Sequence, residues 1–273
     1  METENESQKK MKVPIWDERS GMLSRILRYD EAKRLIAAVD PADQGKVKMD
    51  YPWTRKELRI FLQVRLFTGL RFADILRVMK HPELYQEDGS ILMSRNILRG
   101  GKEKVRTKSF TCYTSDLGRQ IIEGGFFDIP VPQMDSKILT QMTLNILIQA
   151  SKKAGFEVRE FQKEYNTPKK DQFGLPLIGE KGQTLKQKKY REVNVTGINN
   201  LTFRKTWDSW LINSYGSNSL MQVMIEKSMG HSIGTALEHY LTFQFDNDDM
   251  EDIRKATAGF GPRNFKMPET FNK

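Results

Sequence analysis

Residues 54–79 read TRKELRIFLQVRLFTGLRFADILRVM, and their pattern predicts the central helices of the domain. Its first part, Thr54 to Phe67, has one polar stripe while its remaining faces are apolar, which predicts a buried central helix. The polar stripe consists of Lys56, Arg59 and Gln63. Gly69 is expected to end this helix, and residues 72–79 are expected to begin another. A helix, a glycine break and a second helix therefore form the predicted centre of the domain.

Further helices are predicted on both sides of this unit. Asp30 is a suitable N-cap for a helix over residues 31–39, where apolar residues recur at helical spacing before Asp40-Pro41 ends it. Residues 1–20 are polar and are expected to be a mobile tail, with order beginning near Asp30. Apolar periodicity predicts the other helices over residues 135–154, 199–215, 218–229 and 235–240. The acidic run at 246–252 is expected to be a solvated helix N-terminus.

A β-rich stretch is predicted between the helix that begins at residue 72 and the helix over residues 135–154. Asp88-Gly89 is a turn signal, and residues 91–98 and 109–114 are typical of strands that flank the segment RGGKEK at 99–104. Residues 155–195 are weakly periodic and are expected to be a long loop with a short strand or two. The predicted fold class is therefore mainly α with a small β-sheet or hairpin (α+β).

The composition favours a polyanionic partner. The 273 residues include 44 Lys+Arg against 35 Asp+Glu, for a net charge of +9, and the pI is about 9.4. An excess of this size attracts polyanions through electrostatic steering and counterion release. A merely basic globular protein is the alternative. The hydrophobic content of 38% is enough for the core of one large domain.

Cysteine and histidine usage excludes several classes of site. Cys112 is the only cysteine, so disulfides and cysteine-based zinc sites within one chain are excluded. A histidine cage for a metal is not expected from His81, His231 and His239 alone. The chain has no run of about 18 apolar residues and residues 1–11 lack the apolar stretch of a signal peptide. The sequence thus predicts a cytoplasmic protein without a cofactor.

Four residues in short motifs supply two permanent cations, one imidazole and one phenol. They are Arg71 (TGLR, 68–71), Arg204 (FRKTW, 203–207), His231 (MGH, 229–231) and Tyr240 (HY, 239–240). Attack on a DNA phosphate builds negative charge on the non-bridging oxygens, which a planar guanidinium can hold in pairs. A phenol with a pKa of about 10 needs its proton removed or its anion stabilised before it can attack. This combination suits an enzyme that attacks a phosphodiester with a tyrosine and no metal.

The order and context of these motifs resemble the tyrosine recombinase (phage-type integrase) family. In that family the first arginine lies in a TGLR segment, and a Gly-His pair precedes the nucleophilic tyrosine by nine residues, as His231 precedes Tyr240 here. Asp74 adds to the resemblance, because the family places an acidic residue three positions after this arginine. The sequences of these motif segments look most like those of integrases of archaeal viruses and plasmids. Leu201 departs from the pattern, since the second arginine motif is usually His-x-x-Arg.

The resemblance implies a catalytic role for each motif residue. Arg71 and Arg204 would clamp the phosphate, and His231 would donate a further hydrogen bond or assist proton transfer. Tyr240 would become covalently attached to the 3′-phosphate of a DNA strand, without an external cofactor. Each residue also has an ordinary structural reading, such as surface charge for the arginines and a buried aromatic for the tyrosine.

The resemblance also implies a lysine on a β-hairpin that protonates the leaving 5′-oxygen. Lys102 best fits the Gly-Lys form of that motif, and Lys104 is the alternative. Other cations of this hairpin and of a second basic run would contact the DNA backbone, although a solvated charge run explains the second set as well. The DNA-binding candidates are Arg99, Lys104, Arg106, Lys108, Lys186, Lys188, Lys189 and Arg191.

The resemblance covers about residues 30–259. It implies a polar tail at 1–20, a recombinase catalytic domain at 21–260, and a C-terminal tail or exchange arm at 261–273. Family members carry an N-terminal helical domain that clamps the DNA, and about 30 residues are too few for one. The expectation is a catalytic-domain piece or an unusually short integrase of a mobile element, which is nucleoid-associated in a host cell. It would be a monomer in solution and a tetramer on double-stranded DNA.

Two other functions remain open on the same motifs. One is a non-catalytic DNA-binding regulator with the same fold, although a pure binder does not need a phenol nine residues after Gly-His. The other is a type IB topoisomerase without site preference, which would relax DNA lacking any attachment site.

Overall fold

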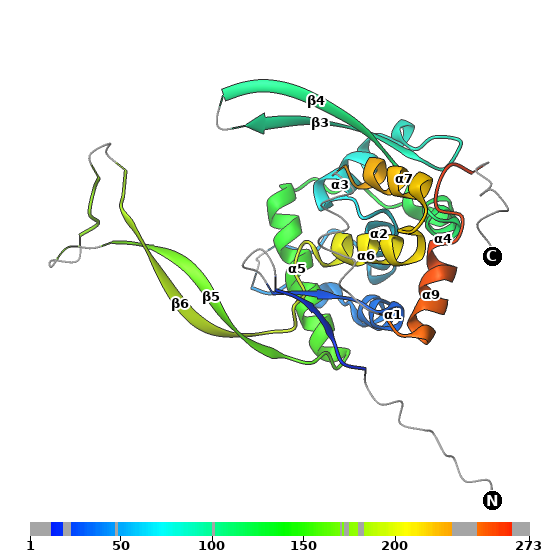
Figure 1. Cartoon of the computed structure of the whole chain (residues 1–273). Coiled ribbons are helices and arrows are strands. Elements are labelled where there is room, and N and C mark those ends of the chain that lie inside the picture. Colours follow the sequence, from blue (N-terminus) through cyan, green and yellow to red (C-terminus); the bar gives the residue numbers. More distant parts are fainter. Residues whose placement is uncertain are drawn as a thin grey trace, which may run out of the picture.

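The computed structural model has a helical body from which two β-hairpins project (Figure 1). It describes residues 12–18, 23–46, 49–99, 102–169, 171, 175–179, 183–230 and 245–263, with the side chains of 94–99, 102–108, 163–166, 191 and 194 left out. The helices are α1 (Tyr29–Ala38), α2 (Arg55–Thr68), α3 (Phe72–Lys80), α4 (Asp116–Ile121), α5 (Ser136–Lys153), α6 (Thr202–Tyr215), α7 (Ser219–Met229) and α9 (Asn247–Thr257). Short helical turns are η2 (Pro41–Asp43), η3 (Pro82–Leu84) and η4 (Ile122–Phe126).

The strands form three two-stranded antiparallel sheets within the described residues, so the fold class is α+β. They are β1 (Ile15–Asp17), β2 (Ser24–Ile26), β3 (Ile91–Arg99), β4 (Lys102–Cys112), β5 (Arg159–Pro168) and β6 (Lys186–Val195). Across the described part of the chain, no helix has both the length and the apolar character that crossing a membrane requires.

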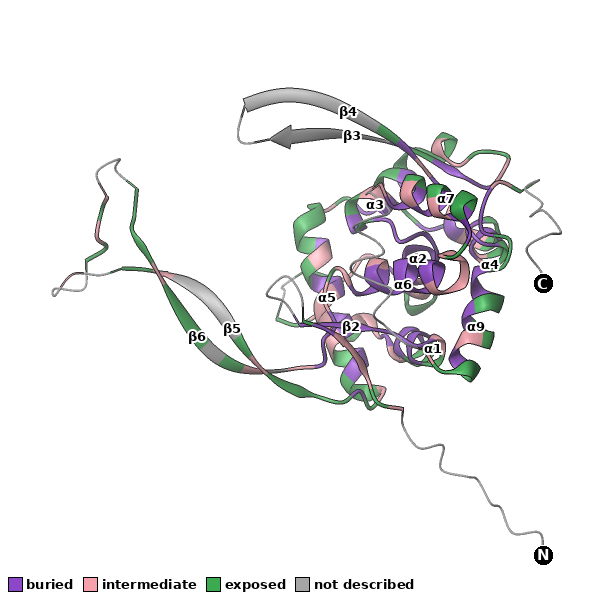
Figure 2. Cartoon of the chain, in the orientation of Figure 1, coloured by how far each residue is buried: buried purple, intermediate pink, exposed green. Residues whose placement is uncertain are grey.

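The core of the body is built around α2 and α6, which are the most deeply buried helices (Figure 2). Phe67 of α2 packs edge-on against Trp207 of α6 with ring centroids 5.8 Å apart, and Trp210 is also fully buried. The prediction that α2 is a buried central helix is confirmed. It begins with a capping box between Thr54 and Glu57, which satisfies the first backbone N–H groups of the helix.

The N-terminal part of the described chain forms the small sheet β1–β2 against α6. The buried carboxylate of Asp17 accepts a hydrogen bond from Lys205 Nζ at 2.7 Å. The predicted mobile tail is therefore wrong for residues 12–18, and so is the prediction of order beginning near Asp30. The polar composition conceals this sheet because its charged groups are buried as a pair instead of being solvated.

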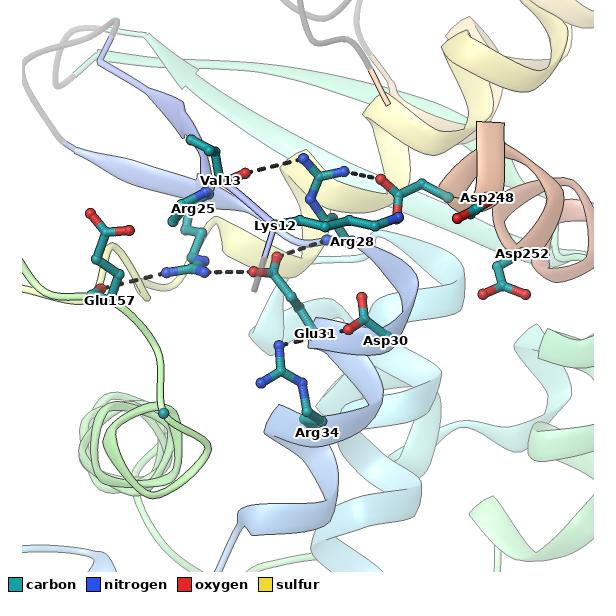
Figure 3. A pocket seen from close by; sticks show the side chains of 13 residues that line it. Lys12, Val13, Arg25, Arg28, Asp30, Glu31, Arg34, Glu157, Asp248 and Asp252 are labelled. Carbon is teal, nitrogen blue, oxygen red and sulfur yellow. Dashed lines mark hydrogen bonds and ion pairs between the residues drawn. The ribbon is translucent and has the colours of Figure 1, made fainter. Parts of the chain in front are cut away.

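A cluster of buried ion pairs joins β2, α1 and α9 and lines a pocket of about 420 Å³ (Figure 3). Arg25 Nη2 lies 2.5 Å from Glu31 Oε1, and Arg28 pairs with Asp249 at the start of α9. Arg28 and Glu31 also cap α1, so the predicted N-cap, Asp30, lies in the first turn instead. The acidic run predicted to be a solvated helix N-terminus does begin α9, but Asp249 within it is buried.

The first hairpin, β3–β4, is longer than predicted. β4 begins at Lys102, whereas Ser109 is the start predicted from sequence. Backbone pairing runs out to Arg99 opposite Lys102, so the predicted connection at 99–104 is mostly strand. The alternation of apolar and polar residues marks only the part of a strand that covers a core, and the outer part of this hairpin extends away from the body (Figure 1).

The second hairpin, β5–β6, replaces much of the predicted long loop at 155–195. Each strand has 10 residues, and all ten positions are paired. The ribbon projects from the body in Figure 1 and has no helix packed on either face along its outer part. A strand without a buried face needs no apolar alternation, so its sequence lacks the usual signal.

The end of the described chain packs onto the body. Phe260 is buried, and the Gly261 carbonyl accepts a hydrogen bond from Arg119 Nη1 at 2.8 Å. The predicted tail or arm at 261–273 is therefore wrong for residues 261–263, and the remainder lies outside the described residues. Phe260, directly before this segment, belongs to the hydrophobic core.

Candidate active site

The TGLR segment is a tight turn between α2 and α3 that places Arg71 at the surface. Thr68 and Leu70 are buried, and the Thr68 hydroxyl accepts a hydrogen bond from the Leu70 N–H at 3.2 Å. Gly69 ends α2 in the left-handed conformation, with φ of 61°. Arg71 is exposed and is the N-cap residue of α3. Arg71 therefore stands at the N-terminus of α3, where the first backbone N–H groups of the helix also favour anions.

Arg204 connects this turn to the end of α7. From the first turns of α6, its Nη1 donates to the Gly69 carbonyl at 3.0 Å and its Nη2 donates to the Met229 carbonyl. Arg204 is half-buried, and these two bonds use two of the five N–H groups of its guanidinium. A single side chain thus brings together the first arginine motif, the second arginine motif and the beginning of the Gly-His motif.

Gly230 ends α7 as Gly69 ends α2. Its φ is 66° and its N–H donates to the Glu226 carbonyl at 2.9 Å. The chain leaves α7 beside Phe110 of β4, whose ring lies 3.7 Å from the position that a Cβ on Gly230 would take. His231 follows directly. Both His231 and Tyr240 lie outside the described residues.

The base of the β3–β4 hairpin is hydrogen-bonded to the TGLR turn and to the last turn of α7. Cys112 Sγ donates to the Thr68 carbonyl at 3.3 Å, and the Tyr113 N–H donates to Ser228 Oγ at 3.1 Å. Lys102 and Lys104 have positions at the outer end of β4, beyond an irregularity in the register of the hairpin, and their side chains are not described.

The remaining predicted DNA contacts divide between the two hairpins. Arg99, Arg106 and Lys108 have positions on β3–β4, which begins at the site, and their side chains are not described. Four others have positions on β6, on the separate hairpin: Lys186, Lys188, Lys189 and Arg191. The structure therefore brings the two arginine motifs and the hairpin base together, and it places the second basic run elsewhere.

Arg65 is a residue of this region that the sequence reading missed. It is buried beneath the two arginine segments, where its Nη2 donates to the Asn200 carbonyl and its guanidinium lies 5.4 Å from the ring centre of Phe72 and 5.6 Å from that of Phe203. Burial lowers the pKa of Arg65 to about 10. A charge within the otherwise apolar side of α2 is the signal that could have identified it. Arg65 links α2, α3 and α6 and so supports the placement of Arg71 and Arg204.

Two other positions bear on the predicted chemistry. Leu201, which stands where the family usually has histidine, is half-buried and precedes α6, where its N–H donates to Asn199 Oδ1 at 2.8 Å. Tyr215 donates its hydroxyl to the Thr257 carbonyl at 2.8 Å, and burial raises the pKa of this phenol. Tyr215 is therefore poorly suited to act as a nucleophile. No cluster of three or more metal-ligating side chains occurs among the described residues.

Substitution of Gly69 by alanine tests the packing of this site. A Cβ there would lie 2.9 Å from Trp207 Cδ1 and 2.9 Å from Met229 Cε, in a left-handed conformation that L residues disfavour. We expect Gly69→Ala to lower the free energy of unfolding by about 2–4 kcal/mol, from both effects. Gly155→Ala is the matched control, because Gly155 also has a positive φ but no atom lies within 4 Å of its Cβ position. Equal losses in urea unfolding would contradict the close contact.

Comparisons of this chain with protein-family models, curated proteins and solved structures gave no match. The candidate site is therefore defined by its own geometry. It consists of an exposed arginine at a helix N-terminus, a second arginine that joins two helix ends, and the base of a basic hairpin.

Proposed function

We propose that this protein is a site-specific DNA recombinase of the tyrosine type, which cleaves and rejoins DNA strands through a covalent 3′-phosphotyrosine intermediate. The observation that carries the proposal is the bridge formed by Arg204. It binds the carbonyls of Gly69 and Met229, which are 135 and 25 residues away in the sequence. Motifs that resemble one family's catalytic segments are thereby joined at one place, as a shared phosphate would require.

The proposed step is a transfer of a phosphodiester from an alcohol to a phenol. The Tyr240 oxygen attacks phosphorus, the bond from phosphorus to the 5′-oxygen breaks, and the phenolic proton passes to a base, for which His231 is the candidate. Lys102, or Lys104 as the alternative, protonates the leaving 5′-oxygen. One phosphodiester replaces another, so the reverse step rejoins the strand without an added energy source.

The two arginines have different surroundings and so would act differently on the phosphate. Arg71 is exposed, and its charge combines with the N-terminus of the nine-residue helix α3. Arg204 is held by two carbonyls and is therefore oriented before any ligand arrives. A preoriented guanidinium loses little freedom when it binds an oxyanion, which is the property that stabilises a charged transition state.

A nicked duplex tests the proposal directly. Cleavage close to the nick releases a short oligonucleotide by diffusion, so the covalent protein–DNA adduct accumulates and migrates slowly on a denaturing gel. A non-catalytic regulator would bind the duplex without giving an adduct. A topoisomerase without site preference would form adducts on any duplex, whereas a recombinase would form them only on duplexes with its own site.

We expect cleavage to persist in excess EDTA. The cations that would otherwise come from a metal are supplied in this proposal by Arg71, Arg204 and a hairpin lysine. The measurement is the rate of adduct formation with and without EDTA, on DNA and protein that were dialysed against chelator beforehand. A rate that depends strictly on added magnesium would favour a nuclease mechanism instead.

The proposed partners follow from the same chemistry. The substrate is double-stranded DNA, and exchange of strands between two duplexes needs four active sites. We therefore propose that a tetramer assembles on DNA from protein that is monomeric in solution.

A further inference from the structure

The β5–β6 ribbon has two faces of different charge. Paired residues of an antiparallel ribbon share a face, and successive positions along each strand alternate between faces. One face has Lys163 paired with Arg191 and Tyr165 paired with Lys189, and none of its positions in the two strands is an acid. We call this the basic face. The acids of both strands fall on the opposite face, at Glu160, Glu164 and Glu192.

This register divides a basic run that looks uniform in the sequence. Lys186 and Lys188 occupy positions on the face that carries the acids, while Lys189 and Arg191 occupy positions on the basic face. Lys163, which the sequence reading did not select, joins them. The four cations of the run therefore occupy positions on two different faces of the ribbon.

The ribbon is anchored firmly at its base. On β5, Arg159 pairs with Glu18 and lies 5.9 Å from the ring centre of Trp16. On the β6 side, Thr196 Oγ1 and Ser151 Oγ of α5 are 2.8 Å apart and hydrogen-bonded. Both strands are thus tied to the body at the base of the ribbon.

We propose that the β5–β6 ribbon lies in the major groove of duplex DNA, with its basic face on the flanking phosphates. The major groove is about 12 Å wide and admits a two-stranded ribbon. Each strand has 10 residues, which at about 3.3 Å per residue span roughly 33 Å. That length is close to one turn of B-form DNA, about 34 Å.

The distribution of charge specifies how the ribbon meets its ligand. Lys163, Lys189 and Arg191 occupy three positions of the basic face within three successive pairs of the register, and Tyr165 occupies the fourth. The three glutamates of the opposite face would be repelled by phosphates, so only one face can be turned towards the DNA. The inference rests on the proposed function for its ligand, and it adds a DNA contact separate from the cleavage site.

Two matched double variants test this inference. Lys189→Gln with Arg191→Gln removes two charges from the basic face, and Lys186→Gln with Lys188→Gln removes two from the opposite face of the same strand. Binding to a fluorescein-labelled duplex is measured by anisotropy over a range of salt concentrations. We expect the basic-face variant to reduce the slope of log affinity against log salt by about 1.8, and affinity at about 0.1 M salt by tens-fold. The other variant should change affinity by about twofold or less.

The outcomes separate this inference from the proposed function. Equal losses in the two variants, or no loss in either, would overturn the inference even if wild-type protein forms the covalent adduct. The expected loss in the basic-face variant alone would support it even if no adduct forms. Tighter binding of double-stranded RNA would also overturn it, because the A-form major groove is too narrow for a ribbon. Lys189→Gln alone, at an exposed position, gives the same test with a slope change of about 0.9, should the double variant be unstable.

Discussion

Substitution of Tyr240 by phenylalanine is expected to abolish the covalent adduct while leaving affinity for the same duplex nearly unchanged. The phenol oxygen is the proposed nucleophile, so its removal leaves no atom to form the bond to phosphorus. Binding depends on the lysines and arginines that contact phosphates, and this variant keeps all of them. Adduct formation on a nicked duplex and anisotropy with an intact duplex measure the two properties separately.

Tyr215→Phe is the matched control for this experiment. Its hydroxyl donates to the Thr257 carbonyl, so its loss should cost about 1 kcal/mol of stability and leave the adduct unchanged. An adduct formed by Tyr240→Phe would remove Tyr240 from the proposed role. Loss of the adduct in Tyr215→Phe, with the protein folded, would point to Tyr215 in spite of its buried hydroxyl.

Substitution of Arg204 by alanine is expected to lower the rate of cleavage at least about a hundredfold, as for the loss of one transition-state donor. The same variant should also lower Tm, because the carbonyls of Gly69 and Met229 lose their common donor. Arg204→Lys should restore little of the rate, since a single ammonium cannot reach both carbonyls and the phosphate with the geometry of a planar fork.

Arg71→Ala, compared with Arg204→Ala, separates an effect on the rate of cleavage from an effect on stability. We expect a comparable loss of rate, but with no change in Tm, because Arg71 is exposed and its side chain has no hydrogen-bond partner within the described part of the chain. Single-turnover cleavage and thermal unfolding give the two readouts. Wild-type cleavage by either alanine variant would show that the phosphate clamp is misassigned.

The helices that cover the core could be predicted from the sequence, and the hairpins could not. Apolar residues recur with a helical period in α2, α5 and α7, because each of these helices packs against the core and keeps a polar stripe outside it. The outer parts of β3–β4 and β5–β6 project away from the helical body (Figure 1), so packing against the core does not constrain their pattern. The β1–β2 sheet was missed because its charged residues are buried, whereas charged residues are usually expected at the surface. Asp17 and Lys205 are buried together, and composition cannot distinguish a buried ion pair from two solvated charges.

The residues of the candidate site were found by their motifs, but the contacts that hold them were not. TGLR predicts a helix break at Gly69, and the structure confirms it. The hydrogen bonds from Arg204 to the Gly69 and Met229 carbonyls could not be inferred from the sequence. Every residue has a backbone carbonyl, so the residue type at the acceptor position gives no sign of such a bond. Arg65 was overlooked in the same way, within a helix that was read as apolar outside its polar stripe.

The docking of α9 limits how far the proposed nucleophile can travel. Arg28 holds Asp249 in the first turn of this helix, and Phe245 immediately before it packs against the core. Tyr240 precedes Phe245 by five residues, and a fully extended chain spans at most about 3.6 Å per residue, so the tether is no longer than about 18 Å. While Arg28 and Asp249 remain paired, Tyr240 therefore stays within this distance of Phe245. Movement of the tyrosine beyond this distance would first require α9 to leave the body, which exposes two charged groups that are now buried.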